Sequence, residues 1–205
     1  LGGQPEDAAH LDDHPGLLQS MDGFPALVSD PWLNGRLTAL HACSDLWACG
    51  AAVSSAMATV TLPMVPGNEQ RELLVQTLAG IRSVLDEQGA ELIGGHTMES
   101  RSTSPMPTSL GVQITLTVNG NSSAPPWLKS GLRIGDALLI SRPLGTGVLF
   151  AGAMTGASKA ADLDAALRGM ARSQHTLLQQ LAPLREGIHA CTDITGFGLL
   201  GHLGE

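Results

Sequence analysis

Residues 31–62 read PWLNGRLTALHACSDLWACGAAVSSAMATVTL, and this stretch combines two periodicities. A helix is expected to begin near Trp32, because Asp30 is a suitable N-cap and Pro31 suits the first helical position. Apolar side chains then recur at helical spacing, at Leu33, Leu37, Leu40, Trp47 and Ala51. Residues 52–62 are rich in Val and Thr and predict a strand. A helix that leads into a strand indicates a fold in which both elements mix.

The same mixture continues on both sides of this stretch. Further strands are expected at residues 17–21, 90–93, 110–118, 137–140 and 188–191. Further helices are expected at residues 68–88, from 144 onward, at 160–171, at 173–184 and from 192 onward. The predicted fold class is therefore α/β, or mixed α+β. The turn-rich residues 119–126 predict a boundary between an N-terminal domain, 1–124, and a C-terminal domain, 125–205.

The composition narrows the range of partners. Of the 205 residues, 43% are hydrophobic and 15% are charged, which is enough apolar surface to build a core. The formal net charge of -8 and the aromatic content of 3% argue against nucleic acid as the main partner, because phosphate repulsion is not offset and base-stacking platforms are scarce. A bound triphosphate would need metal cations to mediate it.

The sequence also bears on the location of the protein and on its chain ends. There is no apolar run of about 20 residues that would span a membrane, and no signal peptide is apparent. We therefore expect no membrane partner and a cytoplasmic location. Because the chain begins at Leu1 and ends at Glu205, directly after an apolar helical start, we expect both ends to be cut from a longer protein.

Three cysteines are present, and they form no CxxC pair. A disulfide scaffold or a structural zinc site is therefore not expected. Cys43, Cys49 and Cys191 are interpreted as small buried hydrophobic residues in a reducing compartment.

Glycines suggest one place where backbone could approach a ligand. Gly94-Gly95-His96-Thr97 directly follows a predicted strand, so its N–H groups and the Thr97 hydroxyl could hold phosphate oxygens. His96 could touch phosphate or only satisfy a loop carbonyl. By itself, such a segment is more often a glycine turn that needs unusual backbone angles.

Four aspartates lie away from any obviously solvated helix face: Asp7, Asp22 and Asp193 at junctions between predicted elements, and Asp45 inside an otherwise apolar helix. Carboxylates in such places suit Mg²⁺, which prefers oxygen ligands and bridges to substrate phosphates. The alternatives are a turn residue for Asp7, a strand-end cap for Asp22 and the N-cap of the last helix for Asp193.

Charged side chains near these aspartates have simpler interpretations as well. His41 and Asp45 share a helix face at i and i+4, which predicts either an ion pair or two groups facing a nucleotide. Lys129, Arg133 and Arg142 are interpreted as solvated surface charges.

Six segments carry a family resemblance, in the family's order and over nearly the whole chain. They are EDAA (6–9), MD (21–22), ACSDLWACG (42–50), LIGGHT (92–97), RPLGTGV (142–148) and CTDITGFGLLGHL (191–203). Together they resemble selenophosphate synthetase (selenide, water dikinase), a family of the AIR-synthetase-like, or PurM-like, ATP-binding superfamily. The last segment is the most specific.

The resemblance implies a fold and a reaction. An N-terminal domain would pair with its twin in a homodimer whose strands form a shared β-barrel, followed by an incomplete α+β C-terminal domain. The family reaction consumes ATP, selenide and water and yields selenophosphate, AMP and phosphate. The resemblance places the Mg²⁺ ligands at Asp7, Asp45 and Asp193. It places the ATP contacts at Asp22, Asp45, Gly95, His96 and Thr97.

This sequence departs from the family at several positions. The family's segment with a catalytic Cys or selenocysteine, and a Lys three residues on, has no counterpart in the sequence, so no catalytic residue is assigned. Glu6 stands where many members have Asp, and His41 where many have Asn. We expect the chain alone not to complete selenophosphate synthesis. Some members are fused behind a flavin-dependent oxidoreductase, and the divergent N-terminal half is compatible with such a fusion.

Two alternatives stay open. The first is another ATP-dependent enzyme of the superfamily, such as an aminoimidazole ribonucleotide synthetase, a thiamine-monophosphate kinase or a hydrogenase-maturation relative. The second is a non-catalytic, nucleotide-binding dimerisation module. Retention of all four aspartates argues against the module, because a degenerate site has no reason to keep them.

Overall fold

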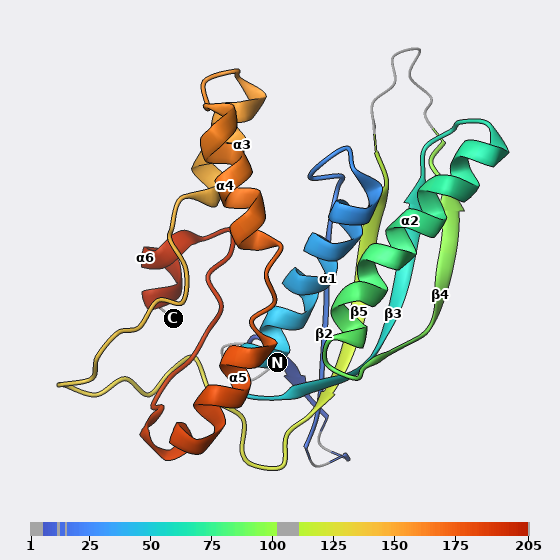
Figure 1. Cartoon of the computed structure of the whole chain (residues 1–205). Helices are drawn as coiled ribbons and strands as arrows, with labels where there is room; N and C mark the ends of the chain where they lie inside the picture. Colours follow the sequence, from blue (N-terminus) through green and yellow to red (C-terminus); the bar gives the residue numbers. More distant parts are fainter. Residues whose placement is uncertain (1–5, 12, 15, 102–110, 205) are drawn as a thin grey trace.

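A five-stranded mixed sheet forms one layer of the N-terminal part of the structure (Figure 1). The computed structural model describes residues 6–11, 13–14, 16–101 and 111–204. The strands are β1 (Ala9–His10), β2 (Leu17–Phe24), β3 (Ala52–Leu62), β4 (Glu91–Glu99) and β5 (Gln113–Asn121). Their order across the sheet is β1-β2-β5-β3-β4; β3 and β4 are parallel, and the other pairs are antiparallel. The mixed α/β fold expected from the sequence is confirmed.

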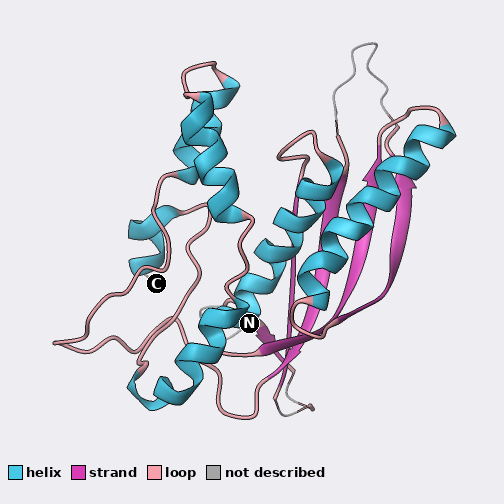
Figure 2. Ribbon diagram, viewed as in Figure 1, coloured by secondary structure: helices cyan, strands magenta, loops and turns pink. Residues whose placement is uncertain are grey.

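Two long helices, α1 (Pro31–Ala48) and α2 (Gly67–Asp86), lie on one face of the sheet (Figure 2). The helix expected near Trp32 is confirmed together with its start signal. The Asp30 carboxylate accepts the Leu33 N–H at 2.8 Å, and Pro31 occupies the first turn. Such a cap contributes about 1 kcal/mol to helix stability.

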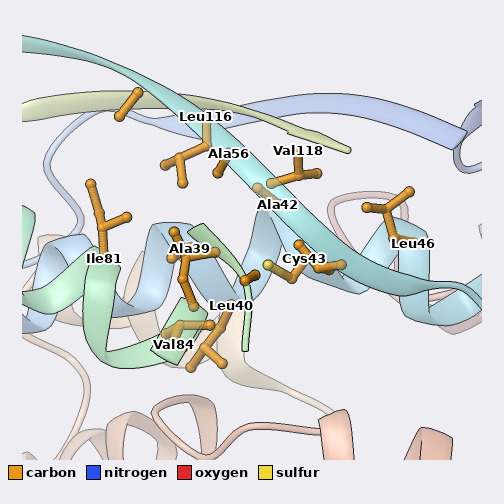
Figure 3. Close-up of a cluster of buried hydrophobic side chains, with 14 of the residues drawn as sticks. Ala39, Leu40, Ala42, Cys43, Leu46, Ala56, Ile81, Val84, Leu116 and Val118 are labelled. Carbon is orange, nitrogen blue, oxygen red and sulfur yellow. The ribbon is translucent and has the colours of Figure 1, made fainter. Parts of the chain in front are cut away.

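The core lies between these helices and the sheet (Figure 3). It is built from alternate strand residues and from the inner stripe of each helix, including Ala39, Leu46, Ile81, Val84, Leu116 and Val118. Cys43 and Cys49 are fully buried in it as free thiols, as expected. Burial, which disfavours the thiolate, raises the pKa of each to about 12, so neither is a ready nucleophile.

Strand β4 differs from the expectation of a short strand ending in a glycine turn. It runs through Gly94 and Gly95 to Glu99, and its register against β3 shifts between Ala56 and Met57. A Cβ at Gly95 would lie 1.9 Å from the carbonyl oxygen of Ala58. The glycine therefore lets β4 pass close to the β3 backbone within the sheet, rather than leave it.

The residues after β5 form short helices around long connections. These are α3 (Thr146–Met154), α4 (Ala160–Met170), α5 (His175–Leu181), the 3₁₀ helix η1 (Ala182–Gly187) and α6 (Gly198–Leu203). The predicted strands at 137–140 and 188–191 are absent from this described segment. A strand needs a partner to complete its ladder, and Leu138 and Leu139 are instead 60% and 88% exposed.

This C-terminal segment packs near the end of α1. The backbone N–H of Trp127 donates to the Cys49 carbonyl at 3.0 Å. The Arg185 guanidinium lies 4.9 Å from the centre of the Trp127 ring. Arg185 also donates to the carbonyls of Gly50 and Pro125.

In the described part of the chain no helix is long and apolar enough to cross a membrane.

Candidate functional site

The four predicted aspartates come together where β2, the end of α1 and residues 192–193 meet. We call Asp7, Asp22, Asp45 and Asp193 the acid cluster. Asp45 is close enough to feel the charges of the other three, and Asp7 feels the charge of Asp193. Residues separated by as many as 186 positions in the sequence therefore share one electrostatic site.

Two serines hold two of these carboxylates in place. The Ser20 hydroxyl donates to Asp45, and the Ser44 hydroxyl donates to Asp193. Ser20 lies two residues before Asp22, so both side chains point to the helix-covered face of β2. Sequence reasoning missed both serines, although their positions two residues from Asp22 and next to Asp45 were available signals.

Asp45 is the most perturbed acid of the cluster. Its burial, followed by the charges of Asp193, Asp22 and Asp7, raises its pKa to about 7, despite the hydrogen bond from Ser20. A carboxylate with such a pKa lacks a neighbouring cation to stabilise its charge. Perturbed groups of this kind mark candidate binding sites.

Asp22 is paired with His41, which replaces the expected pair of His41 with Asp45. The Nε2 atom of His41 lies 2.6 Å from Asp22 Oδ2, and its ring stacks on Phe24 at 4.4 Å. Burial favours the neutral forms of both groups, but their mutual interaction lowers the pKa of Asp22 and raises that of His41. The ion-pair alternative for His41 and Asp45 is wrong, because β2 brings Asp22 to the ring, whereas the alternative that both groups face a nucleotide stays a prediction. Asp22 is also not a strand-end residue, since β2 continues to Phe24.

Asp7 is paired with a lysine. Lys129 Nζ lies 3.0 Å from Asp7 Oδ1, and the side chains are only 18% and 6% exposed. The Lys129 N–H donates to Glu6 at 2.9 Å, and Thr192 donates to Asp7 at 3.3 Å. Burial and the charge of Asp193 raise the pKa of Asp7, while Lys129 and Thr192 oppose that rise. The interpretation of Lys129 as a solvated surface charge is therefore wrong.

Asp193 does not cap the last helix. Helix α6 begins at Gly198 and Phe197 precedes it, so the N-cap alternative is wrong. The loop between Asp193 and α6 is held by His202, whose Nε2 accepts the Thr195 N–H at 3.1 Å. Asp193 is consequently free of a helix-end role and faces Ser44 and the other carboxylates.

The other predicted nucleotide residues, Gly95, His96 and Thr97, lie elsewhere in this chain. Asp22 pairs with Leu116, Leu116 with Ala58 and Ala58 with Gly95, so three strand spacings separate Asp22 from Gly95. That is about 14 Å. His96 and Thr97 are exposed on the edge strand β4. A single chain therefore does not bring them to the acid cluster.

The acid cluster has the right donor chemistry for Mg²⁺, since carboxylate oxygens are its preferred protein ligands. Among the described residues, no three His, Cys, Asp or Glu side chains are placed so that they could hold a metal ion. The carboxylates are instead engaged by Ser20, Ser44, His41 and Lys129. Metal binding would thus require Asp7, Asp45 and Asp193 to exchange these partners for the ion.

Comparison with known families divides the chain in two. Residues 5–120 match the N-terminal domain of AIR synthase related proteins, and residues 133–205 match the C-terminal domain of the same proteins. Both matches contain members of the acid cluster.

The chain is also similar to curated selenide, water dikinases. It is 33% identical over 203 residues to the protein from Bdellovibrio bacteriovorus, covering 98% of this chain and 55% of the relative. It is 36% identical over 206 residues to the protein from Burkholderia ambifaria, covering 96% of this chain and 53% of the relative. The chain thus spans about half the length of these relatives.

Solved structures share the fold at lower identity. A thiamine-monophosphate kinase from Stenotrophomonas maltophilia has a TM-score of 0.68 at 19% identity, covering 94% of this chain and 63% of the other. A hydrogenase maturation protein HypE in complex with ATP has a TM-score of 0.63 at 22% identity, covering 86% and 51%. At these identities, the two similarities show a shared fold.

Proposed function

The chain belongs to the AIR synthase related protein family, whose two domain matches span most of its length, and we propose that it carries the nucleotide and metal site of a selenide, water dikinase. The resemblance noted in the sequence is confirmed at the level of the family. The proposed reaction converts selenide, ATP and water to selenophosphate, AMP and phosphate. Because the chain spans about half the length of its relatives, we propose that it does not complete this reaction alone.

The observation that carries the proposal is the convergence of four carboxylates, two of them held by serine hydroxyls and two by ion pairs. The raised pKa of Asp45 supports it. Four acids that converge from four parts of the chain repel one another, and this repulsion is unfavourable for folding unless cations offset it. A site for Mg²⁺ with a polyphosphate explains this arrangement. Phosphoryl transfer depends mainly on positioning and charge neutralisation, which such a site supplies.

Individual roles follow from the contacts. Asp7, Asp45 and Asp193 would hold Mg²⁺, whose charge would neutralise the phosphates of bound ATP. Asp22 keeps its negative charge at neutral pH because His41 and the Gly23 N–H stabilise it, so it can accept hydrogen bonds from the nucleotide. Ser20 and Ser44 orient Asp45 and Asp193.

We propose that the protein is a homodimer in which strand β4 of a second copy supplies Gly95, His96 and Thr97. Two observations favour this arrangement. These residues lie on an edge strand, too far from Asp22 to complete the site within one chain. The sheet face opposite the helices also carries exposed apolar side chains, with Met21 69% and Met57 44% exposed. Burial of this face against a twin sheet would form the expected barrel.

The proposed domain division, 1–124 and 125–205, is supported by the gap between the two family matches, at residues 121–132. A cytoplasmic location is part of the same proposal.

An alternative function comes from the fold: a kinase acting on another substrate, such as thiamine monophosphate, because a protein of that name shares the architecture. A non-catalytic nucleotide-binding module is the other alternative.

The test is selenide-dependent formation of AMP and phosphate from ATP, in the longest natural protein that contains this sequence. We expect turnover with selenide and its loss in Asp45→Asn, with Asp86→Asn as a control of equal charge change on an exposed part of α2. Formation of ADP with thiamine monophosphate would point to the alternative kinase. Nucleotide binding without turnover of either substrate would point to the module. Either result would overturn the proposal.

A further inference from the structure

Lys129 provides a positive charge inside an otherwise acidic site. Its ammonium lies 3.0 Å from Asp7, in a pair that is largely shielded from solvent. Its backbone is fixed separately, because the Lys129 N–H donates to Glu6 and the Leu128 carbonyl accepts the Cys191 N–H. The position of this side chain is therefore set by the fold and is not that of a loosely solvated surface lysine.

The charges explain why this lysine lies where it does. The acid cluster carries up to four negative charges, and the described ion pairs offset two of them, through His41 at Asp22 and Lys129 at Asp7. Within the described residues, the carboxylate of Asp45 accepts the Ser20 hydroxyl and that of Asp193 accepts the Ser44 hydroxyl. The ammonium is thus held by a carboxylate of the same cluster that is proposed to bind a divalent cation.

We propose that Lys129 is a built-in competitor for the divalent cation: its ammonium occupies Asp7 when the site is metal-free and is displaced when the cation binds. This inference rests on the proposed function, since it takes Asp7 to be a metal ligand. Asp7 cannot give the same oxygen to both cations at close range, because ammonium and Mg²⁺ repel each other. Lys129 holds only Oδ1 of Asp7, but a divalent cation on either oxygen of that carboxylate would repel the ammonium and weaken the ion pair.

Displacement of Lys129 has a structural consequence. The lysine follows the connector between the two family matches, whereas Asp7 precedes β2. The ion pair therefore joins the start of the C-terminal segment to the N-terminal part of the site. Exchange of the ammonium for a metal would couple metal occupancy to the position of residues 127–129.

The unmodified protein offers a direct test, because it has only two lysines, Lys129 and Lys159. Lys159 is exposed just before helix α4 and serves as an internal control. Acetylation of lysine amines is followed at both positions by peptide mass spectrometry, in chelator and in saturating Mg²⁺. We expect Lys129 to react more slowly than Lys159 in chelator, and its reaction to accelerate several-fold with Mg²⁺. Unchanged or slower reaction of Lys129 in Mg²⁺ would overturn the inference.

Variants give an independent readout through Mn²⁺ affinity, measured without nucleotide by electron paramagnetic resonance. Lys129→Met removes the competing charge and should tighten Mn²⁺ binding about tenfold, as expected for loss of a shielded charge pair. Lys129→Arg keeps the charge and should not tighten it. Lys159→Met makes the same change in net charge at a distance and should have little effect.

Two other outcomes would overturn the inference in different ways. If Lys129→Met leaves Mn²⁺ affinity unchanged but weakens binding of an ATP analogue, Lys129 contacts phosphate and is not a competitor, while the proposed function stands. If neither the wild type nor Lys129→Met binds Mn²⁺, the metal site itself is wrong, and the proposed function fails with it. Circular dichroism establishes that each variant is folded, and the acetylation test does not depend on any variant.

Discussion

Replacing Asp45 with Asn should stabilise the metal-free protein at pH 8, although it removes a proposed ligand. Burial and the neighbouring carboxylates raise the pKa of Asp45 from 3.8 to about 7. A raised pKa means that folding favours the neutral acid, so the stabilising contribution of Asp45 is present below pH 3.8 and is lost as the pH rises to about 7. At pH 8 the folded protein holds an unfavourable carboxylate, which Asn does not have.

The size of the effect follows from the shift. About three pKa units at 1.4 kcal/mol each give a ceiling of about 4 kcal/mol, and solvent access to this half-buried carboxylate lowers the expected gain to about 2 kcal/mol. Asn also retains an oxygen that can accept the Ser20 hydroxyl. Most of the gain should be absent at pH 4, where the folded carboxyl is neutral and the ordinary pKa of 3.8 leaves the unfolded carboxyl only about half ionised.

The assay is urea unfolding in metal-free buffer at pH 4 and pH 8, followed by the fluorescence of the three tryptophans. Asp86→Asn, which makes an equal charge change at an exposed residue of α2, is the matched control and should change stability little at either pH. A loss of stability in Asp45→Asn at pH 8, or an effect independent of pH, would refute the reasoning that the carboxylates repel one another.

Two further predictions concern the fold. Gly95→Ala should lower the free energy of unfolding by about 2 kcal/mol, because the new Cβ would lie 1.9 Å from the Ala58 carbonyl oxygen. A Cβ at Gly94 would meet no atom within 4 Å, so Gly94→Ala should be tolerated. Equal stability of the two variants in urea would contradict this. Arg185→Met should lower the free energy of unfolding by about 1–2 kcal/mol, because it removes the contact with the Trp127 ring and hydrogen bonds to two carbonyls. It should also change the tryptophan emission. Unchanged stability and emission would show that the contact is unimportant.

Local sequence patterns were sufficient to predict the helices and strands that surround the core. Helix α1 carries its own start signal in Asp30 and Pro31, and β3 has the bounds that the Val- and Thr-rich stretch predicts. The strict alternation before Asn119 identified β5, although the strand starts at Gln113 and runs on to Asn121. These elements were predictable because the residues that specify each of them are neighbours in the sequence.

Features that depend on a partner strand were not predictable in this way. Residues 137–140 have strand-like composition but no ladder neighbour in the described segment after β5. Conversely, β4 continues through two glycines because the adjacent β3 backbone accommodates it. Propensity describes a residue, whereas a strand also requires a neighbour at the correct distance.

The candidate site was predictable in its acids but not in their partners. The loop positions of Asp7 and Asp193 indicated two of these residues, and the resemblance also selected Asp22 in β2 and Asp45 in α1. The fold does bring the four together. Lys129 is 122 residues from Asp7, so no local pattern indicates their ion pair. Such contacts are set by the way the C-terminal segment packs near α1.

We propose that the acid cluster binds a nucleotide through Mg²⁺. Calorimetric titration of this chain with a non-hydrolysable ATP analogue, with and without Mg²⁺, tests it most directly. We predict Mg²⁺-dependent binding by the wild type, none by the folded Asp45→Ala variant and unchanged binding by Asp86→Asn. Binding that is equally strong without Mg²⁺, or that survives Asp45→Ala, would contradict the claim and place the nucleotide elsewhere.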